Sequence, residues 1–141
     1  MADRNGARGQ APQARARGKG AEELVARYFQ EKGFRLLARN WSTRLGEVDL
    51  IVEKGTLIVF VEVRFRSSIA FGRPEETITP AKRRKVVLAA FQYAEWRGLL
   101  HQRVLRFDVV AVLEGSRGLR IVHIEDAFEV DETRLIAPSF G

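Results

Sequence analysis

The sequence contains no cysteine and no long hydrophobic run. Without cysteine the chain cannot form disulfide bonds or thiolate metal sites, which fits the reducing cytoplasm, where we expect the protein to lie. No apolar stretch approaches the roughly 20 residues that cross a bilayer. The first residues also lack the hydrophobic segment of a signal peptide. These absences exclude a disulfide-stapled secreted fold and predict a protein without a membrane span.

The remaining composition is that of one soluble domain: 141 residues, 45% of them hydrophobic and 30% charged. The net charge of +6 is concentrated at the start of the chain. Residues 1–19 contain one acid, Asp3, and five bases: Arg4, Arg8, Arg15, Arg17 and Lys19. This segment has little with which to build a core, so we expect a disordered basic tail. Such a tail suits contacts with nucleic-acid phosphates or serves as a solubilising extension.

Two helices are predicted from periodicity and end signals. Apolar residues at three- and four-residue spacing predict a helix that starts at Gly20 and ends at Gly33, a left-handed C-cap. Thr79 and Pro80 have the residue types of an N-cap and a first helical position. The second helix is expected to run from there to about Arg97.

Five β-rich runs predict strands, at Phe34–Asn40, Glu47–Val52, Leu57–Arg64, Leu105–Leu113 and Leu119–Ile124. The stretch 65–79 is predicted to be a loop. The order α-β-β-β-α-β-β is typical of an α/β domain with a mixed sheet flanked by helices. We expect this domain over residues 20–128, with residues 129–141 as a C-terminal extension.

Two acidic residues interrupt neighbouring apolar strands, Asp49 in EVDLIV and Glu62 in IVFVEVR. The turn between the strands leaves two registers open. A turn at Lys54-Gly55 pairs Asp49 with Phe60, whereas a turn at Gly55-Thr56 places Asp49 opposite Glu62. Either register puts both carboxylates on one face, roughly 4.5–8 Å apart at Cβ.

A buried, unpaired carboxylate costs several kcal/mol, so two of them indicate a use. An all-oxygen acidic site selects Mg²⁺ or Mn²⁺. Glu22 borders the buried stripe of the first helix and is a third candidate ligand, whereas Glu23 points to solvent. Arg64 shares the face of Glu62 and could stabilise a phosphate. The hypothesis is metal-assisted phosphodiester hydrolysis; the alternative is a buried network in which the acids pair with arginine.

Basic residues at the start of the second helix oppose the positive end of its dipole. They form the run Lys82-Arg83-Arg84-Lys85. A bound phosphate would resolve the conflict, and Glu75 and Glu76 are the alternative neutralising groups. Lys82 is also the residue that could supply an ammonium to the acidic site.

Other residues that could contact nucleic acid lie next to or within the predicted loop: Arg66, Arg73 and Phe71. Trp41, Phe65 and Trp96 are expected in the core, because aromatic residues of a small domain usually pack there. Asp108 lies in an apolar strand, where an ion pair explains it as well as catalysis does. His101 and His123 have no ligand spacing to each other and are left out of the site.

Several ordered motifs together resemble the YraN-like family of small bacterial proteins. They are Gly-Ala-Glu-Glu-Leu (20–24), Arg-Asn-Trp (39–41), Gly-Glu-Val-Asp-Leu-Ile (46–51), Val-Phe-Val-Glu-Val-Arg-Phe-Arg (59–66), Thr-Pro-Ala-Lys (79–82) and Arg-Phe-Asp-Val-Val (106–110). The family is similar to PD-(D/E)XK nucleases, alongside Holliday-junction resolvases and restriction endonucleases. The resemblance implies an αβββαβ core and an Mg²⁺- or Mn²⁺-dependent endonuclease.

The same resemblance implies metal binding by Glu22, Asp49 and Glu62. The next position of the nuclease motif usually holds lysine, and this chain has Arg64 there. Arginine stays protonated and cannot act as a base, so the alternative function is a nucleic-acid-binding module with impaired catalysis. DNA is the expected partner, with RNA left open. A homodimer is expected only by analogy with enzymes that cut two strands.

Overall fold

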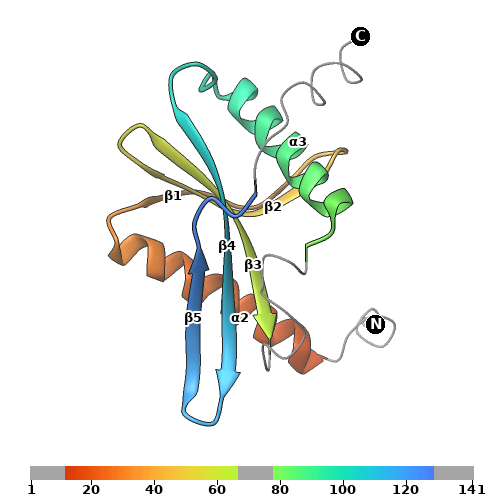
Figure 1. Ribbon diagram of the computed structural model, residues 1–141, viewed down its shortest axis with the longest axis vertical. Helices are drawn as coiled ribbons and strands as arrows, with labels where there is room; N and C mark the ends of the chain where they lie inside the picture. Colours follow the sequence, from red (N-terminus) through yellow and green to blue (C-terminus); the bar gives the residue numbers. More distant parts are fainter. Residues whose placement is uncertain (1–11, 67–77, 129–141) are drawn as a thin grey trace.

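The computed structural model describes residues 12–66 and 78–128, with the backbone alone for residues 12–18. Within these residues the elements follow the predicted order of helix, three strands, helix and two strands. They are α2 (Pro12–Glu31), β1 (Arg35–Ser42), β2 (Glu47–Lys54), β3 (Leu57–Arg66), α3 (Pro80–Trp96), β4 (Val104–Gly115) and β5 (Gly118–Ile124). Figure 1 shows α3 beside the upper part of the sheet and α2 crossing its lower part.

The strands form one mixed sheet in the order β1-β2-β3-β4-β5. Only β3 and β4 are parallel, because the connection between them passes through α3 and returns the chain to the same end of the sheet. The other neighbours are antiparallel. This architecture confirms the predicted α/β class and the αβββαβ order of the core.

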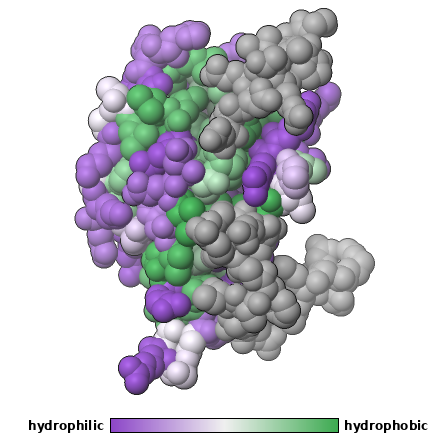
Figure 2. All heavy atoms as spheres, viewed as in Figure 1, coloured by the Kyte–Doolittle hydropathy of each residue, from purple (hydrophilic) through white to green (hydrophobic). Residues whose placement is uncertain are grey.

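Strand alternation divides the apolar side chains between two cores. Ile51 and Phe60 pack with α3 on one face of the sheet. Leu50 and Val61 pack with α2 on the other face. In Figure 2 hydrophobic side chains gather toward the middle of the visible face, and hydrophilic ones line its left edge. None of the helices in the described part of the chain is long and apolar enough to cross a membrane.

The β2–β3 hairpin adopts the second of the two registers left open by the sequence. Lys54 pairs with Leu57 and Leu50 pairs with Val61, so Gly55-Thr56 forms the turn. Gly55 has a φ of 61°, in the left-handed region that glycine adopts without strain. One further step along this register sets Asp49 opposite Glu62.

The helix ends follow their sequence signals with one exception. The Thr79 hydroxyl caps α3 by accepting the Lys82 N–H at 3.1 Å, with Pro80 at the first position. Gly33 follows α2 with a φ of 94°. However, α2 begins at Pro12, so the prediction of a disordered tail is wrong for residues 12–19. Proline is favoured at a first helical position, and the Ala, Arg and Gln residues after it are good helix formers.

Some predicted features lie outside the described residues. They are residues 1–11 of the tail, the loop positions Phe71, Arg73, Glu75 and Glu76, and the extension 129–141.

A close backbone contact docks α3 against the start of β2. A Cβ added to Gly46 would lie 2.7 Å from the carbonyl carbon of Lys85 and 2.9 Å from its Cβ. Only glycine permits this approach, because backbone atoms cannot move aside as a flexible side chain can. The contact fixes the first turns of α3 beside the strand that carries Asp49.

We expect Gly46→Ala to lower the free energy of unfolding by about 1–3 kcal/mol, because the added methyl group forces α3 away from β2. Gly20→Ala is the matched control, since nothing lies within 4 Å of its added Cβ. Removing a helical glycine there should stabilise the protein by about 0.5–1 kcal/mol. Urea denaturation of both variants measures the difference, and equal effects would contradict the proposed docking contact.

Candidate metal centre

Asp49 and Glu62 meet on the α3 side of the β2–β3 hairpin. Glu62 is almost fully buried, with 4% of its surface exposed. Asp49 is half-buried, and its Oδ2 accepts the backbone N–H of Val63 at 2.8 Å. That hydrogen bond holds the Asp49 carboxylate against β3, beside Val63, which directly follows Glu62.

Lys82 reaches this pair from the first turn of α3. Its Nζ lies 3.6 Å from Oε2 of Glu62. The cap at Thr79 and the contact at Gly46 set the position of this turn. The structure therefore places an ammonium in the site, although the motif position after Glu62 holds Arg64.

Among the residues that the structure describes, two buried polar atoms of the site have no hydrogen-bond partner, Oε1 of Glu62 and Nε of Arg64. An unsatisfied carboxylate oxygen is expensive to bury, and a cation is the natural group to satisfy it. Mg²⁺ is commonly held by one or two carboxylates, with water and phosphate oxygens as its other ligands. The donor set of Asp49 and Glu62 fits such an ion.

Burial and mutual repulsion change the acidity of both carboxyl groups. Burial raises the pKa of Asp49 to about 6. The hydrogen bond from Val63 lowers this pKa, whereas the charge of Glu22 raises it further. Burial and the charge of Asp49 raise the pKa of Glu62 to about 7, although Lys82 and Arg64 lower it. Near neutral pH the pair therefore changes its proton content, as is common at functional sites.

Glu22 is near enough to act on Asp49 electrostatically, but it does not join the pair in a three-ligand group. Its Oε1 accepts a hydrogen bond at 3.2 Å from the side-chain amide of Asn40, whose φ of 47° is left-handed. Within residues 12–66 and 78–128, no three His, Cys, Asp or Glu side chains are grouped as a metal site. Glu23 points away and lies 3.8 Å from Arg39.

The basic residues predicted to contact nucleic acid separate in space. Lys82 faces Glu62, whereas Arg83 donates to the Ile78 carbonyl at 3.1 Å and lies over the Phe128 ring. Burial and the nearby charge of Arg64 lower the pKa of Arg66. Arg64 acts on Glu62 as well, so positive charge continues along β3 from the carboxylate pair to Arg66.

A second polar network lies on the opposite, α2 side of the sheet. Asp108 is fully buried and accepts two hydrogen bonds from Arg106, both 2.9 Å long. His123 Nε2 lies 2.6 Å from Oδ2 of Asp108, and its Nδ1 lies 2.8 Å from the Tyr28 hydroxyl. The backbone N–H of Asp126 also donates to Asp108. Burial would raise the pKa of Asp108, but these hydrogen bonds outweigh it and hold the pKa below its usual value.

Sequence reasoning misses the contact between Asp108 and His123. The tight turn between Gly115 and Gly118 contains the signal, because it fixes a register in which Val110 faces His123. Asp108 is two residues from Val110 and shares its face. The network links β4, β5 and α2, which explains Asp108 structurally.

The aromatic side chains follow the prediction except at one position. Trp41 and Phe65 are partly buried and pack against the two cores. Trp96 is 69% exposed, so its expected place in the core is wrong. It is the last residue of α3, where the helix has already passed the edge of the core.

Comparison with known proteins gives the family of this chain. The model of "Uncharacterised protein family UPF0102" matches residues 21–112. The chain belongs to the UPF0102 family. This confirms the YraN-like resemblance of the motifs.

Three UPF0102 proteins illustrate the similarity. That of Anaeromyxobacter dehalogenans is 48% identical over 126 residues, which cover 89% of this chain and 93% of the relative. That of Pelotomaculum thermopropionicum is 44% identical, covering 79% of this chain and 93% of its own. That of Nitrosococcus oceani is 40% identical, covering 83% and 94%.

We expect Asp108→Asn to lower the free energy of unfolding by about 3–5 kcal/mol, because it leaves the Arg106 guanidinium without its buried counter-charge. Glu95→Gln is the control: it neutralises an exposed carboxylate on α3, away from this network, and we expect an effect within about 0.5 kcal/mol. Urea denaturation at pH 7 compares them. A loss below 1 kcal/mol for Asp108→Asn would argue against an ion-pair role.

Glu62→Gln should stabilise the metal-free protein, and more so at pH 8 than at pH 5. Burial raises the pKa of Glu62 in the folded protein to about 7, above the ordinary glutamate value of 4.5. The folded form therefore binds more protons than the unfolded form between these pH values and loses stability as pH rises. We expect a gain larger by about 1–3 kcal/mol at pH 8. Denaturation in EDTA at both pH values measures it, with the exposed Glu23→Gln as control. A gain independent of pH would contradict the raised pKa.

Proposed function

We propose that this protein is a divalent-metal-dependent endonuclease of the PD-(D/E)XK type that hydrolyses phosphodiester bonds of DNA. The principal observation behind this proposal is the buried Oε1 of Glu62, a carboxylate oxygen without a hydrogen-bond partner beside the Asp49 carboxylate. A purely structural glutamate on a core strand would have its oxygens satisfied. The motifs around Asp49 and Glu62 supply the independent support from sequence.

The residues of the site can be given roles. Asp49 and Glu62 would hold Mg²⁺ or Mn²⁺, with Glu22 as the third candidate if it turns from Asn40. When bound, such an ion lowers the pKa of a water ligand and neutralises charge that develops on the phosphate. Both carboxyl groups must lose their protons before they bind a cation, so their raised pKa values predict tighter binding as the pH rises from about 6 to 8.

Arg64 and Lys82 would divide the work that lysine performs alone in related nucleases. Arg64 is permanently protonated and presents a planar set of N–H donors, which suits the orientation of a phosphate. Its buried Nε has no hydrogen-bond partner within residues 12–66 and 78–128 and could make this bond. Lys82 Nζ lies 3.6 Å from Oε2 of Glu62 and is a compact ammonium, so it is the candidate for orienting an attacking water beside the carboxylates.

The second candidate function is a nucleic-acid-binding module without cleavage. Arg64 at the usual lysine position favours it, because arginine cannot act as a base. The positive charge of Arg64 and Arg66 along β3 supports nucleic-acid contact in either case. Cleavage in the presence of a divalent metal distinguishes the two functions.

The test incubates the purified protein with labelled single-stranded, duplex and branched DNA, and with RNA, in Mg²⁺, Mn²⁺ or EDTA. We expect metal-dependent cleavage that Asp49→Asn and Glu62→Gln reduce by at least about 100-fold, the scale on which removing a transition-state contact acts. Glu23→Gln is the matched control and should keep wild-type activity. Equal activity in Asp49→Asn, Glu62→Gln and wild type would identify a contaminating nuclease.

Metal binding is measured separately from cleavage. Isothermal titration with Mg²⁺ or Mn²⁺ should show binding at pH 8, weaker binding at pH 5.5, and none for Glu62→Gln. Metal binding and salt-dependent DNA binding without cleavage would favour the second function. Gain of cleavage by Arg64→Lys would then identify the arginine as the cause.

A further inference from the structure

Trp96 forms an exposed aromatic surface at the end of α3. Its ring is stacked with Trp41 at a centroid distance of 6.4 Å and an interplanar angle of 25°. Tyr93 contacts both indoles edge-on, at 6.0 Å from Trp96 and 5.3 Å from Trp41. Trp96 is thus supported from within, while 69% of its surface remains open to solvent.

Arginine residues surround this aromatic cluster. The guanidinium of Arg97 lies 6.0 Å from the Trp96 ring centroid and donates to the Tyr93 hydroxyl at 2.9 Å. Arg35 and Arg103 both contact Glu53, at 2.6 and 3.3 Å. Burial raises the pKa of Tyr93, and the charges of Arg97, Glu53 and Arg35 also change it. These three charged groups therefore lie close to the aromatic cluster. With the exposed Glu95, the residue before Trp96, counted as well, the three arginines exceed the two acids by one charge.

We infer that Trp96, supported by Trp41, is a stacking platform for an unpaired base of single-stranded nucleic acid. Sites for single strands combine aromatic rings with a cationic surround, because the rings stack on bases while the cations contact phosphates. Trp96 and the neighbouring arginines have both properties. A protein interface is the alternative occupant of an exposed tryptophan. The surplus positive charge favours the nucleic acid.

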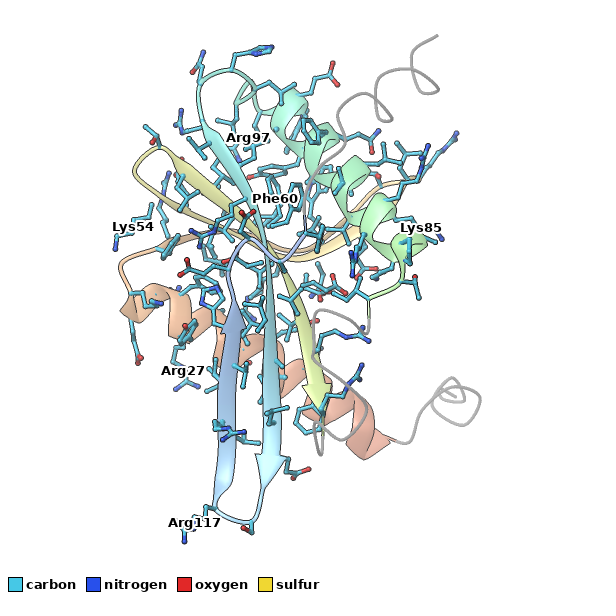
Figure 3. All side chains as sticks on the ribbon, viewed as in Figure 1. Arg27, Lys54, Phe60, Lys85, Arg97 and Arg117 are labelled. Atoms are coloured by element: carbon cyan, nitrogen blue, oxygen red, sulfur yellow. The ribbon has the colours of Figure 1, made fainter. Side chains whose placement is uncertain are left out.

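The position of the platform relates it to the carboxylate pair. Trp96 follows Lys82 by fourteen residues on α3, which is about 3.9 helical turns. On the side of the helix between them Val86, Ala89 and Tyr93 are buried against the sheet, so a strand that reaches both residues must pass around this side. The same interval is about 21 Å along the axis. In Figure 3 Lys85 lies near the first turns of α3 and Arg97 beyond its other end.

A strand that contacts both places must cover this distance. At the rise of about 3.4 Å per nucleotide found in stacked strands, the straight distance alone requires about seven nucleotides. The platform would therefore hold an unpaired segment at least about seven nucleotides from the carboxylate pair. The nucleic-acid class of the partner rests on the proposed function, which this inference refines to a substrate with a single-stranded part.

The test uses the two tryptophans of the chain, Trp41 and Trp96, as fluorescent reporters. The full-length protein is titrated in EDTA with a 12-nucleotide oligothymidylate and with an abasic strand of equal length. We expect the oligothymidylate to quench the fluorescence and bind more tightly than the abasic strand. Trp96→Ala should weaken its binding about 5- to 150-fold, the range for loss of one stacked base.

Two further variants make the result specific. Trp96→Phe should restore part of the affinity, because phenylalanine still offers a ring face. Leu119→Ala removes another exposed apolar side chain, on the β4–β5 hairpin, and should bind as wild type. Circular dichroism confirms that each variant is folded.

Several outcomes would overturn the inference. Equal affinity for the abasic strand would reduce the surface to a site for phosphates alone. Unchanged binding by Trp96→Ala would exclude stacking. If the wild type sediments as a dimer and Trp96→Ala as a monomer, the surface is instead an interface with a second copy of the chain. Because EDTA prevents metal-dependent cleavage, failure here leaves the nuclease proposal standing. If Glu62→Gln abolishes cleavage but still binds the oligothymidylate as wild type, the stacking platform is supported independently of catalysis.

Discussion

The site depends on one electrostatic constraint: Asp49 and Glu62 share a face of a hairpin and are largely removed from water. Both cannot be ionised there without compensation. The Val63 N–H and the Lys82 ammonium supply part of it. The remaining deficit appears as raised pKa values and an unsatisfied oxygen on Glu62. A bound cation would supply what is lacking, which is the reason for proposing a metal-dependent nuclease over an ion-pair network.

Much of this arrangement could be predicted from local sequence. Thr79-Pro80 marks the start of α3 because the chemistry of a cap is local, and strand alternation places Asp49 and Glu62 on one face in either register. The choice between registers could not be made, because Lys54, Gly55 and Thr56 allow a turn one residue earlier or later. The start of α2 was also missed, since helix propensity competes closely with disorder in a short polar segment.

Contacts between elements that are far apart in the chain could not be predicted from the sequence. That Lys82 reaches Glu62 depends on the approach of α3 at Gly46, a contact between backbones that no side-chain pattern encodes. The exposure of Trp96 depends on where the sheet edge lies relative to the end of α3. Both features place side chains of the proposed sites at opposite ends of one helix. A rigid helix would thereby fix the separation of those sites.

The network around Asp108 has a consequence for the protein during its synthesis. Ribosomes release Arg106 and Asp108 before His123 and Asp126, two of the partners that satisfy the buried carboxylate. Until those residues emerge, burial of β4 leaves the charge incompletely compensated, at a cost of several kcal/mol. The strand therefore cannot settle into the sheet while the chain ends before β5. Completion of the sheet waits for the last strand to be translated, which keeps a half-made chain from closing around an unpaired charge.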